Sequence, residues 1–234
     1  MKSELEEAAI KRFFRLDFDW NAVVRRLTEC HPGIEPIVEK FPGLRPLRIG
    51  NAESVLFSFL CSANNNIARI TKMVHDLERL GEQIENAFDL ECYTFPDVAT
   101  IGSKPEAFWR DRRFGYRAAY LTQLCRELEK RPKDLFISLK DADIHSASAV
   151  LESLPGIGPK VAACIALYGL HLDDAVPVDV HMWRSYLKHF AKDRSETFST
   201  KHHRIVGDVM RDKFGKLAGW AQLFYFCDQL SPKA

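Results

Sequence analysis

The chain has 234 residues, 46% of them hydrophobic, so it can bury a substantial core in one domain or in two tightly packed ones. Its 33 Lys and Arg against 32 Asp and Glu leave a formal net charge of +1, which counts mildly against a nucleic-acid binder unless the basic residues gather on one face. No apolar run reaches the ~18 residues of a membrane-spanning helix. The start, MKSELEEAAIKR, is typical of a charged helix rather than a signal peptide, so we expect an intracellular protein with no membrane partner.

The cysteines predict reduced thiols rather than a metal centre. They are spaced roughly evenly, and none forms a C-x-x-C pair or a cluster with histidines, so the sequence supports neither a zinc site nor an iron–sulfur cluster. Scattered thiols of this kind are typical of an intracellular protein. The six are Cys30, Cys61, Cys92, Cys125, Cys164 and Cys227.

Helical periodicity dominates the chain from its first residues. Asp19 is the predicted N-cap of a helix over 19–29, and Asn64 to Asn66 interrupt a buried apolar run before the helical pattern resumes. Convincing alternating strands and Asn-Gly turns are missing, so the sequence predicts an all-α fold. The helices are expected over 3–14, 19–29, 33–41, 52–62, 67–80, short pieces within 93–115, 116–130, 133–139, 142–153, 159–169, 179–190, 200–213 and 217–229.

The string Leu154-Pro155-Gly156-Ile157-Gly158-Pro159-Lys160 predicts a helix–hairpin–helix element, which grips a nucleic-acid backbone without reading its sequence. Two glycines let the backbone turn sharply and keep side chains out of the way of an approaching anion. The unsatisfied N–H groups of the next helix point out of the turn, which suits a phosphate. We expect the amides of Gly156, Gly158 and Val161 to bind that phosphate.

Lys160 and Asp179 sharpen this pattern. Lys160 opens the second hairpin helix, where a lysine can be a nucleophile or can simply touch a phosphate. Asp179 follows Pro177 where another helix starts, so it is a predicted N-cap. A cap would also fix the direction of its carboxylate, which could then stabilise positive charge or move a proton. A binding module would need only the glycines and the helix dipole, so the pair favours an enzyme.

At these residues the chain resembles the eukaryotic-type 8-oxoguanine DNA glycosylases of the helix–hairpin–helix DNA glycosylase superfamily. The likeness runs from about residue 10 to about residue 230 and is carried by five separated, ordered strings. They are LFSFLCSANNNIARIT (56–71), FGYRAAYL (114–121), LPGIGPKVAACI (154–165), AVPVDVHMWR (175–184) and AGWAQ (218–222).

The resemblance implies two helical subdomains flanking a cleft, with the hairpin at their junction. Residues 51–153 would form the middle subdomain, 154–234 the hairpin and the C-terminal subdomain, and 1–50 helices that pack with the latter. Longer members of the family begin with an antiparallel sheet domain, which contributes a backbone carbonyl to reading the damaged base. This chain starts where that domain would end, either because the protein is natively short or because its start is truncated. Base discrimination is therefore the part of the activity that the resemblance covers least.

The resemblance also implies a reaction, the excision of 8-oxoguanine opposite cytosine from double-stranded DNA. The damaged nucleotide is flipped out of the duplex. The amine of Lys160 attacks C1′, and the Schiff base that follows permits β-elimination of the strand, with Asp179 assisting at C1′. The enzyme would be a bifunctional N-glycosylase and AP lyase of base-excision repair. Its chemistry needs no cofactor, it would work as a monomer, and it would be nuclear if the source is eukaryotic.

Further residues take roles by resemblance, each beside a purely structural interpretation. Without the family, Cys164 and Phe226 would be core residues, Tyr116 a core aromatic, Arg69 part of a solvated helix face, and His181 structural. The residues implied for the damaged base are Gln222, Phe226 and Cys164. Those implied for the opposite cytosine and the gap in the stack are Asn64, Arg69, Tyr116 and Arg117, and His181 is implied for a phosphate. Backbone carbonyls of Glu152, Leu154 and Ile157 would hold a structural monovalent or calcium ion.

Two other functions remain open at the level of sequence. The same fold and Lys160 could serve another oxidised purine, or AP lyase activity alone, and the missing sheet domain motivates this alternative. The chain could also be a non-catalytic helix–hairpin–helix DNA-binding module. Borohydride trapping separates this last alternative from the enzymes, because only a protein that forms a Schiff base becomes covalently attached to DNA.

Overall fold

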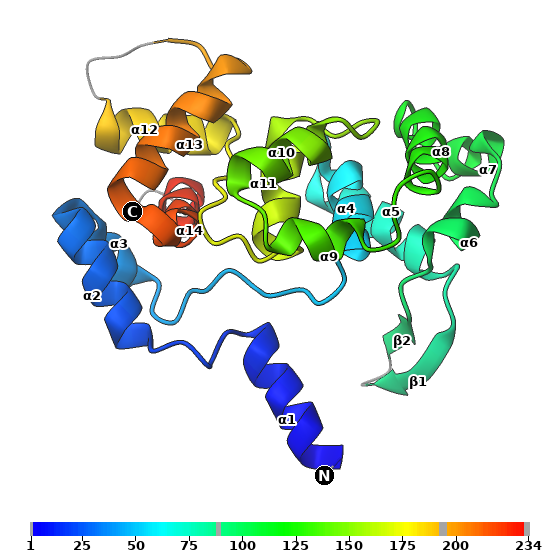
Figure 1. Cartoon of the computed structure of the whole chain (residues 1–234), viewed down its shortest axis with the longest axis horizontal. Coiled ribbons are helices and arrows are strands. Elements are labelled where there is room, and N and C mark those ends of the chain that lie inside the picture. Colours follow the sequence, from blue (N-terminus) through cyan, green and yellow to red (C-terminus); the bar gives the residue numbers. More distant parts are fainter. Residues whose placement is uncertain (1, 88–89, 192–195, 232–234) are drawn as a thin grey trace. The chain divides into compact units, whose positions relative to one another are not determined.

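The computed structural model describes residues 2–87, 90–191 and 196–231, and the regular secondary structure of these residues is almost entirely helical (Figure 1). The predicted all-α fold is therefore confirmed. The chain divides into two compact units: a first unit of residues 1–50 and 162–234, and a second unit of residues 51–161. The hairpin lies in the second unit, and helix α11 (Pro159–Tyr168) starts there and continues into the first.

The first unit is a helical layer built around its last helix, α14. Asp19 caps α2 as predicted, because its Oδ1 accepts the N–H groups of Asn21 and Ala22 at 3.0 and 3.2 Å. Helix α14 packs against α12 and α13, and the side chains between them form the apolar core of the unit. Besides α11, its elements are α1 (Lys2–Phe13), α2 (Trp20–Cys30), the 3₁₀ turn η1 (Pro32–Ile34), α3 (Glu35–Lys40), α12 (Val180–Phe190), α13 (Lys201–Phe214), the 3₁₀ turn η2 (Gly215–Leu217) and α14 (Ala218–Leu230).

The second unit packs α4 against α5 and α8, and α8 against α6 and α7. Its core is apolar and includes the fully buried Trp109 and Phe114, which lie just before α8. Most predicted helices in this unit are present with ends shifted by at most two residues. Its elements are α4 (Ala52–Ser62), α5 (Ile67–Glu78), β1 (Gln83–Ala87), β2 (Leu90–Tyr93), α6 (Val98–Gly102), α7 (Glu106–Asp111), α8 (Arg117–Leu128), α9 (Leu135–Lys140) and α10 (Ile144–Glu152).

The prediction that strands are missing throughout was wrong at one place. Strands β1 and β2 pair antiparallel, with Gln83 opposite Tyr93 and Ile84 opposite Cys92. At their base, Gly81 lies so close to the backbone that a Cβ there would stand 1.8 Å from the carbonyl oxygen of Thr94. The pairing thus depends on a close backbone approach between residues well separated in the chain, and short polar strands carry little periodic signal of it.

Two further features concern the cysteines and the lengths of the helices. None of the six cysteines, which all lie in the described residues, forms a disulfide. Among the helices of the described residues, none combines the length and the apolar character needed to cross a membrane.

Candidate active site

The hairpin joins α10 to α11 through a turn that only glycine can make. Gly156 has φ +79°, in the left-handed region, and a Cβ on it would lie 2.9 Å from Leu60 Cδ1 and from Cβ and Cγ of Tyr120. The turn is closed by the N–H of Ile157, which donates to the carbonyl of Leu154 at 3.1 Å. Gly156 is therefore required by the packing of the hairpin on α4 and α8.

Gly158 has no such internal reason to be glycine. Its φ lies outside the left-handed region, and an added Cβ would meet nothing within 4 Å. The residue is exposed, so the backbone of the turn is open to a group from outside the protein. This is the surface at which the sequence predicts a phosphate.

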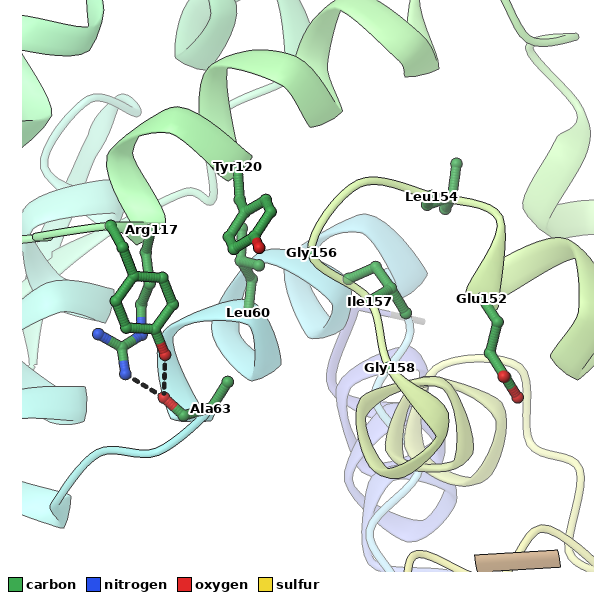
Figure 2. A pocket seen from close by; sticks show the side chains of 10 residues that line it. Leu60, Ala63, Arg117, Tyr120, Glu152, Leu154, Gly156, Ile157 and Gly158 are labelled. Atoms are coloured by element: carbon green, nitrogen blue, oxygen red, sulfur yellow. Dashed lines mark hydrogen bonds between the residues drawn. The ribbon is translucent and has the colours of Figure 1, made fainter. Parts of the chain in front are cut away.

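A pocket of about 390 Å³ lies between the hairpin and the first turn of α8 (Figure 2). Figure 2 shows the Tyr120 ring beside Gly156 and the Arg117 guanidinium directed toward the carbonyl of Ala63. Its lining residues come from α4, α8, α10 and the hairpin: Leu60, Ala63, Tyr116, Arg117, Tyr120, Glu152, Leu154, Gly156, Ile157 and Gly158. The structure thus brings several of the predicted site residues of the second unit to one cavity.

Lys160 lies in the first turn of α11, directly after Pro159, a residue that suits the first position of a helix. The side chain is half-buried, and its Nζ lies 5.2 Å from the centroid of the Phe59 ring. It forms no ion pair with a carboxylate of any described residue. Cys164, one helical turn further on, is buried. An amine without a counter-charge, held against an aromatic ring, is available for chemistry.

The three asparagines after α4 have different roles. Asn66 caps α5, with Oδ1 accepting the N–H of Arg69 at 3.0 Å, and Asn65 donates to the carbonyl of Cys61 at 3.0 Å. Asn64 is exposed, has φ +47°, and its side chain makes no hydrogen bond within the described part of the chain. Two of the three side-chain amides therefore hold the loop itself, and the amide of Asn64 is exposed to solvent.

Arg117 is a buried cation without a counter-charge. It is only 2% exposed, and its guanidinium donates to the carbonyls of Ala63 and Asn64, the latter at 3.0 Å. No described carboxylate pairs with it, and its Nε is buried without a hydrogen-bond partner. Burial raises the pKa of the nearby Cys61 thiol to about 12, although the Arg117 charge opposes the shift. Such a cation favours an external acceptor.

Tyr116 and Arg69 each donate a hydrogen bond to a loop carbonyl of the second unit. Tyr116 is 50% exposed, donates its hydroxyl to the carbonyl of Ala63 at 3.1 Å, and its ring lies 4.5 Å from the Arg117 guanidinium carbon. Arg69 is exposed and donates to the carbonyl of Arg113 at 2.7 Å, in the loop that precedes α8. Tyr116 and Arg117 thus both bond to the loop that carries Asn64. Arg69 bonds to the loop between α7 and α8.

In the first unit, Asp179 caps α12 as predicted. Its Oδ1 accepts the N–H groups of His181 and Met182, both at 2.9 Å. Its Oδ2 accepts no hydrogen bond from the residues that the structure describes, so one carboxylate oxygen is fixed and the other remains available. The ring of His181 packs edge-on against Phe226, with the centroids 6.4 Å apart.

Gln222 presents a buried amide on α14. It is 4% exposed, and its Oε1 is buried with no hydrogen-bond partner among the described residues. The start of this helix is fixed by Gly219, whose N–H donates to the Asp173 carbonyl at 2.8 Å and whose Cβ position is filled by Leu167 and Ala175 at 2.6 Å. Phe226, one turn after Gln222, is half-buried. An unpaired buried oxygen is destabilising, which suggests a partner from outside.

Two residues of this arrangement were not predicted. Tyr120 is 41% exposed, lies edge-on to Tyr116 with ring centroids 6.0 Å apart, and contacts the hairpin at Gly156. Phe59 lies against Lys160. Both fall in strings that carry the family resemblance, and Tyr120 is four residues after Tyr116, so the helical spacing could have placed it on the same face.

No family model matches the chain. Individual proteins do: N-glycosylase/DNA lyase OGG1 of Arabidopsis thaliana is 35% identical over 228 residues, which are 96% of this chain and 62% of that protein. N-glycosylase/DNA lyase of Saccharomyces cerevisiae is 32% identical over 203 residues, 75% of this chain and 54% of that protein. The chain thus spans less than two thirds of either relative.

Among solved structures, the 8-oxoguanine glycosylase/lyase of Clostridium acetobutylicum superposes with a TM-score of 0.82 at 26% identity. The match covers 95% of this chain and 74% of that one. That protein was solved in complex with double-stranded DNA containing cytosine opposite 8-oxoguanine. A 3-methyladenine DNA-glycosylase from Archaeoglobus fulgidus, at 18% identity and a TM-score of 0.71, shares the fold.

Proposed function

This chain is a homologue of the OGG1-type N-glycosylase/DNA lyases with the helix–hairpin–helix glycosylase fold, and we propose that it is a bifunctional DNA glycosylase and AP lyase that excises 8-oxoguanine opposite cytosine. The observation that carries the proposal is the position of Lys160. It lies in the first turn after the hairpin, beside Phe59 and without an ion pair to any carboxylate in the described residues. A lysine that only bound phosphate would not require Asp179 as well, since a binding module needs only the glycines and the helix dipole.

In the proposed reaction Lys160 is the nucleophile. The lone pair of its neutral amine forms the bond to C1′, while the pair of the glycosidic bond leaves with the base, which takes up a proton. Loss of the proton from nitrogen and opening of the C1′–O4′ bond give the Schiff base. Removal of a proton from C2′ then expels the 3′ phosphate by β-elimination. These steps release the base and break the strand without an added oxidant or reductant.

Asp179 would act through its free oxygen. The cap holds Oδ1 on two backbone N–H groups, so the carboxylate cannot rotate freely and Oδ2 keeps one direction. A fixed negative charge stabilises the positive charge that develops at C1′, and the same oxygen can carry protons between steps. Capping and catalysis are therefore compatible in one residue.

The damaged base would be read from α14. The unpaired Oε1 of Gln222 can accept a hydrogen bond from the edge of a flipped purine, and the Phe226 ring can stack on its face. Cys164, on the same helical face as Lys160, would pack against the base. Binding of the base would satisfy the buried oxygen that the protein alone leaves unpaired.

The orphaned cytosine would be held by the second unit. Arg117 and Arg69 offer planar sets of donors to the acceptors of cytosine, which suits the fork geometry of a guanidinium. Asn64 would fill the gap in the stack, and Tyr116 would wedge it open. Both side chains are exposed, and the left-handed backbone of Asn64 projects it from the loop.

Phosphate binding would come from the hairpin and from His181. The amides of Gly156, Gly158 and Val161 lie in the turn and the first helical turn, where N–H groups lack intrahelical partners. A monovalent or calcium ion would be held by the carbonyls of Glu152, Leu154 and Ile157, and its role would be structural. The carbonyl of Leu154 already accepts one N–H and has a second lone pair to offer such an ion.

The proposed partner is double-stranded DNA with an oxidised guanine, bound by a monomer. A protein with this substrate would act inside the cell, and in the nucleus if the source is eukaryotic.

The first experiment uses duplexes with one 8-oxoguanine opposite each of the four bases, beside an abasic-site duplex, with and without borohydride. We expect cleavage and trapping to be strongest opposite cytosine. Lys160→Gln should abolish trapping and leave duplex binding intact, because the amide cannot form a Schiff base. Lys130→Gln, at an exposed lysine of the second unit, is the matched control and should trap like the wild type.

The outcomes separate the alternatives. Trapping on the abasic duplex alone would indicate an AP lyase without recognition of 8-oxoguanine, and the proposal would be reduced to the lyase step. Duplex binding without any trapping would indicate a non-catalytic helix–hairpin–helix module. Continued trapping by Lys160→Gln would refute the assignment of the nucleophile.

A further inference from the structure

The loop between α7 and α8 has an arginine where its backbone favours glycine. Arg113 has φ +65°, in the left-handed region. Its N–H donates to the Arg110 carbonyl at 2.9 Å and the N–H of Phe114 donates to the Trp109 carbonyl at 3.1 Å, which closes the end of α7. Glycine is the usual residue at this position of a helix terminus, because a side chain there costs backbone free energy. An arginine at a position where its side chain costs backbone free energy is a candidate for a functional role.

The side chain of Arg113 is exposed, and within the described residues it has neither an ion pair nor a hydrogen bond. Its neighbours differ. Arg110 pairs with Glu106 at 2.5 Å, and Arg112 lies 3.5 Å over the Phe108 ring and donates to the Phe108 carbonyl. Arg110 at the end of α7 and Arg112 in the loop are thus satisfied by the protein, and Arg113 presents its charge to solvent.

The position of Arg113 places that charge beside the residues proposed to hold the orphaned base. Its carbonyl accepts the hydrogen bond from Arg69 at 2.7 Å, and Tyr116 follows three residues later. The left-handed backbone therefore serves two purposes: it aims the carbonyl at Arg69 and leaves the Arg113 guanidinium on the outside of the same loop.

We propose that Arg113 is a further DNA-binding residue, whose guanidinium contacts a backbone phosphate of the duplex next to the orphaned base. The inference rests on the proposed function, because it assumes that Arg69 and Tyr116 face DNA. A guanidinium is suited to phosphate because its charge and its planar donors match two phosphate oxygens. The contact would add affinity and would carry no information about base sequence.

The test measures binding to a duplex with a tetrahydrofuran abasic-site analogue opposite cytosine, which cannot form a Schiff base, over a range of salt. Arg113→Gly removes the guanidinium and relieves the left-handed strain, so its melting temperature should equal or exceed that of the wild type. We expect the slope of log affinity against log salt to become shallower by about 0.9, as for one lost phosphate contact. The affinity deficit of the variant should narrow about threefold between roughly 50 and 200 mM salt.

Two matched variants serve as controls for the loss of the Arg113 charge. Arg113→Lys keeps the charge and the strain, and we expect it to restore the wild-type slope. Arg110→Gln removes an arginine that Glu106 already neutralises, and its slope should not change. Equal slopes for Arg113→Gly and the wild type would overturn the inference. Failure of the wild type to bind the duplex would overturn the proposed function itself, and this inference with it.

Discussion

At the scale of the residue, Gln222 is the clearest departure from what stability alone would select. A buried amide oxygen without a partner destabilises a folded protein, yet this one lies on a helix whose start is tightly fixed at Gly219. Arg117 presents the same situation with a charge, since only carbonyls satisfy its buried guanidinium. Both residues are more easily explained by an external ligand than by the fold.

We predict that Gln222→Met lowers the excision activity without lowering the free energy of unfolding. The thioether fills nearly the same volume and removes the unpaired oxygen, so the free energy of unfolding should stay level or rise by about 1 kcal/mol. Excision of 8-oxoguanine should fall at least about tenfold, because a hydrogen bond that reads the base is lost. Trapping on an abasic site, which needs no base, should remain.

Gln229→Met, on the same helix about two turns later, is the control for the general effect of methionine on α14. It should change neither excision nor trapping. A Gln222→Met enzyme that excised the base at the wild-type rate would show that the amide does not read it.

At the scale of the element, the two glycines of the hairpin have different structural roles. Gly156 is held by packing, because its left-handed φ and the side chains of Leu60 and Tyr120 exclude a Cβ. Gly158 has open space around it and lies outside the left-handed region. One glycine therefore shapes the element, and the other leaves its outer face accessible.

The two alanine variants should behave oppositely. Gly156→Ala should lower the free energy of unfolding by about 2–3 kcal/mol, from the left-handed backbone and the overpacking together. Gly158→Ala should change it by less than about 0.5 kcal/mol, as at most surface positions, but should weaken duplex binding if a phosphate approaches that face. Urea unfolding and duplex titration of each variant measure both effects. Equal stability of the two variants would contradict the packing argument.

At the scale of the whole molecule, a half-buried histidine ties the stability of the first unit to pH. The His31 ring is hydrogen-bonded to the Tyr225 hydroxyl at 2.6 Å and stacks on Phe190. Burial lowers the pKa of His31, and the charge of Lys213 lowers it further. The folded protein therefore binds a proton on the His31 ring less readily than the unfolded chain does.

The consequence is a loss of stability in weak acid. Above the pKa of ~6.5 that a histidine has in the unfolded chain, neither state is protonated and the contribution of His31 is complete. Below it the unfolded chain takes up a proton that the folded state refuses, so stability falls until the lower folded pKa is reached. Tryptophan fluorescence during urea unfolding from about pH 7.5 to 5 measures this, since Trp20, Trp183 and Trp220 lie in the first unit. We expect His31→Gln to flatten the dependence, and an unchanged slope would exclude His31 as its source.

The sequence by itself determined which segments are helical, where most of them begin, and where the hairpin lies. These features are local: apolar periodicity, the caps Asp19 and Asp179, and the glycines of the turn act within a few residues of one another. The family resemblance was equally a matter of local strings. It also named the site residues.

Only the tertiary structure decided how the side chains meet. The Arg117 bonds to the Ala63 and Asn64 carbonyls join residues more than 50 positions apart, and the contact of Gly156 with Tyr120 spans two helices. The pairing of β1 with β2, the orphaned oxygen of Gln222 and the strained, exposed Arg113 are likewise invisible in composition and spacing. Such features depend on which distant groups packing brings close and which it leaves without a partner, and local propensity carries no record of either.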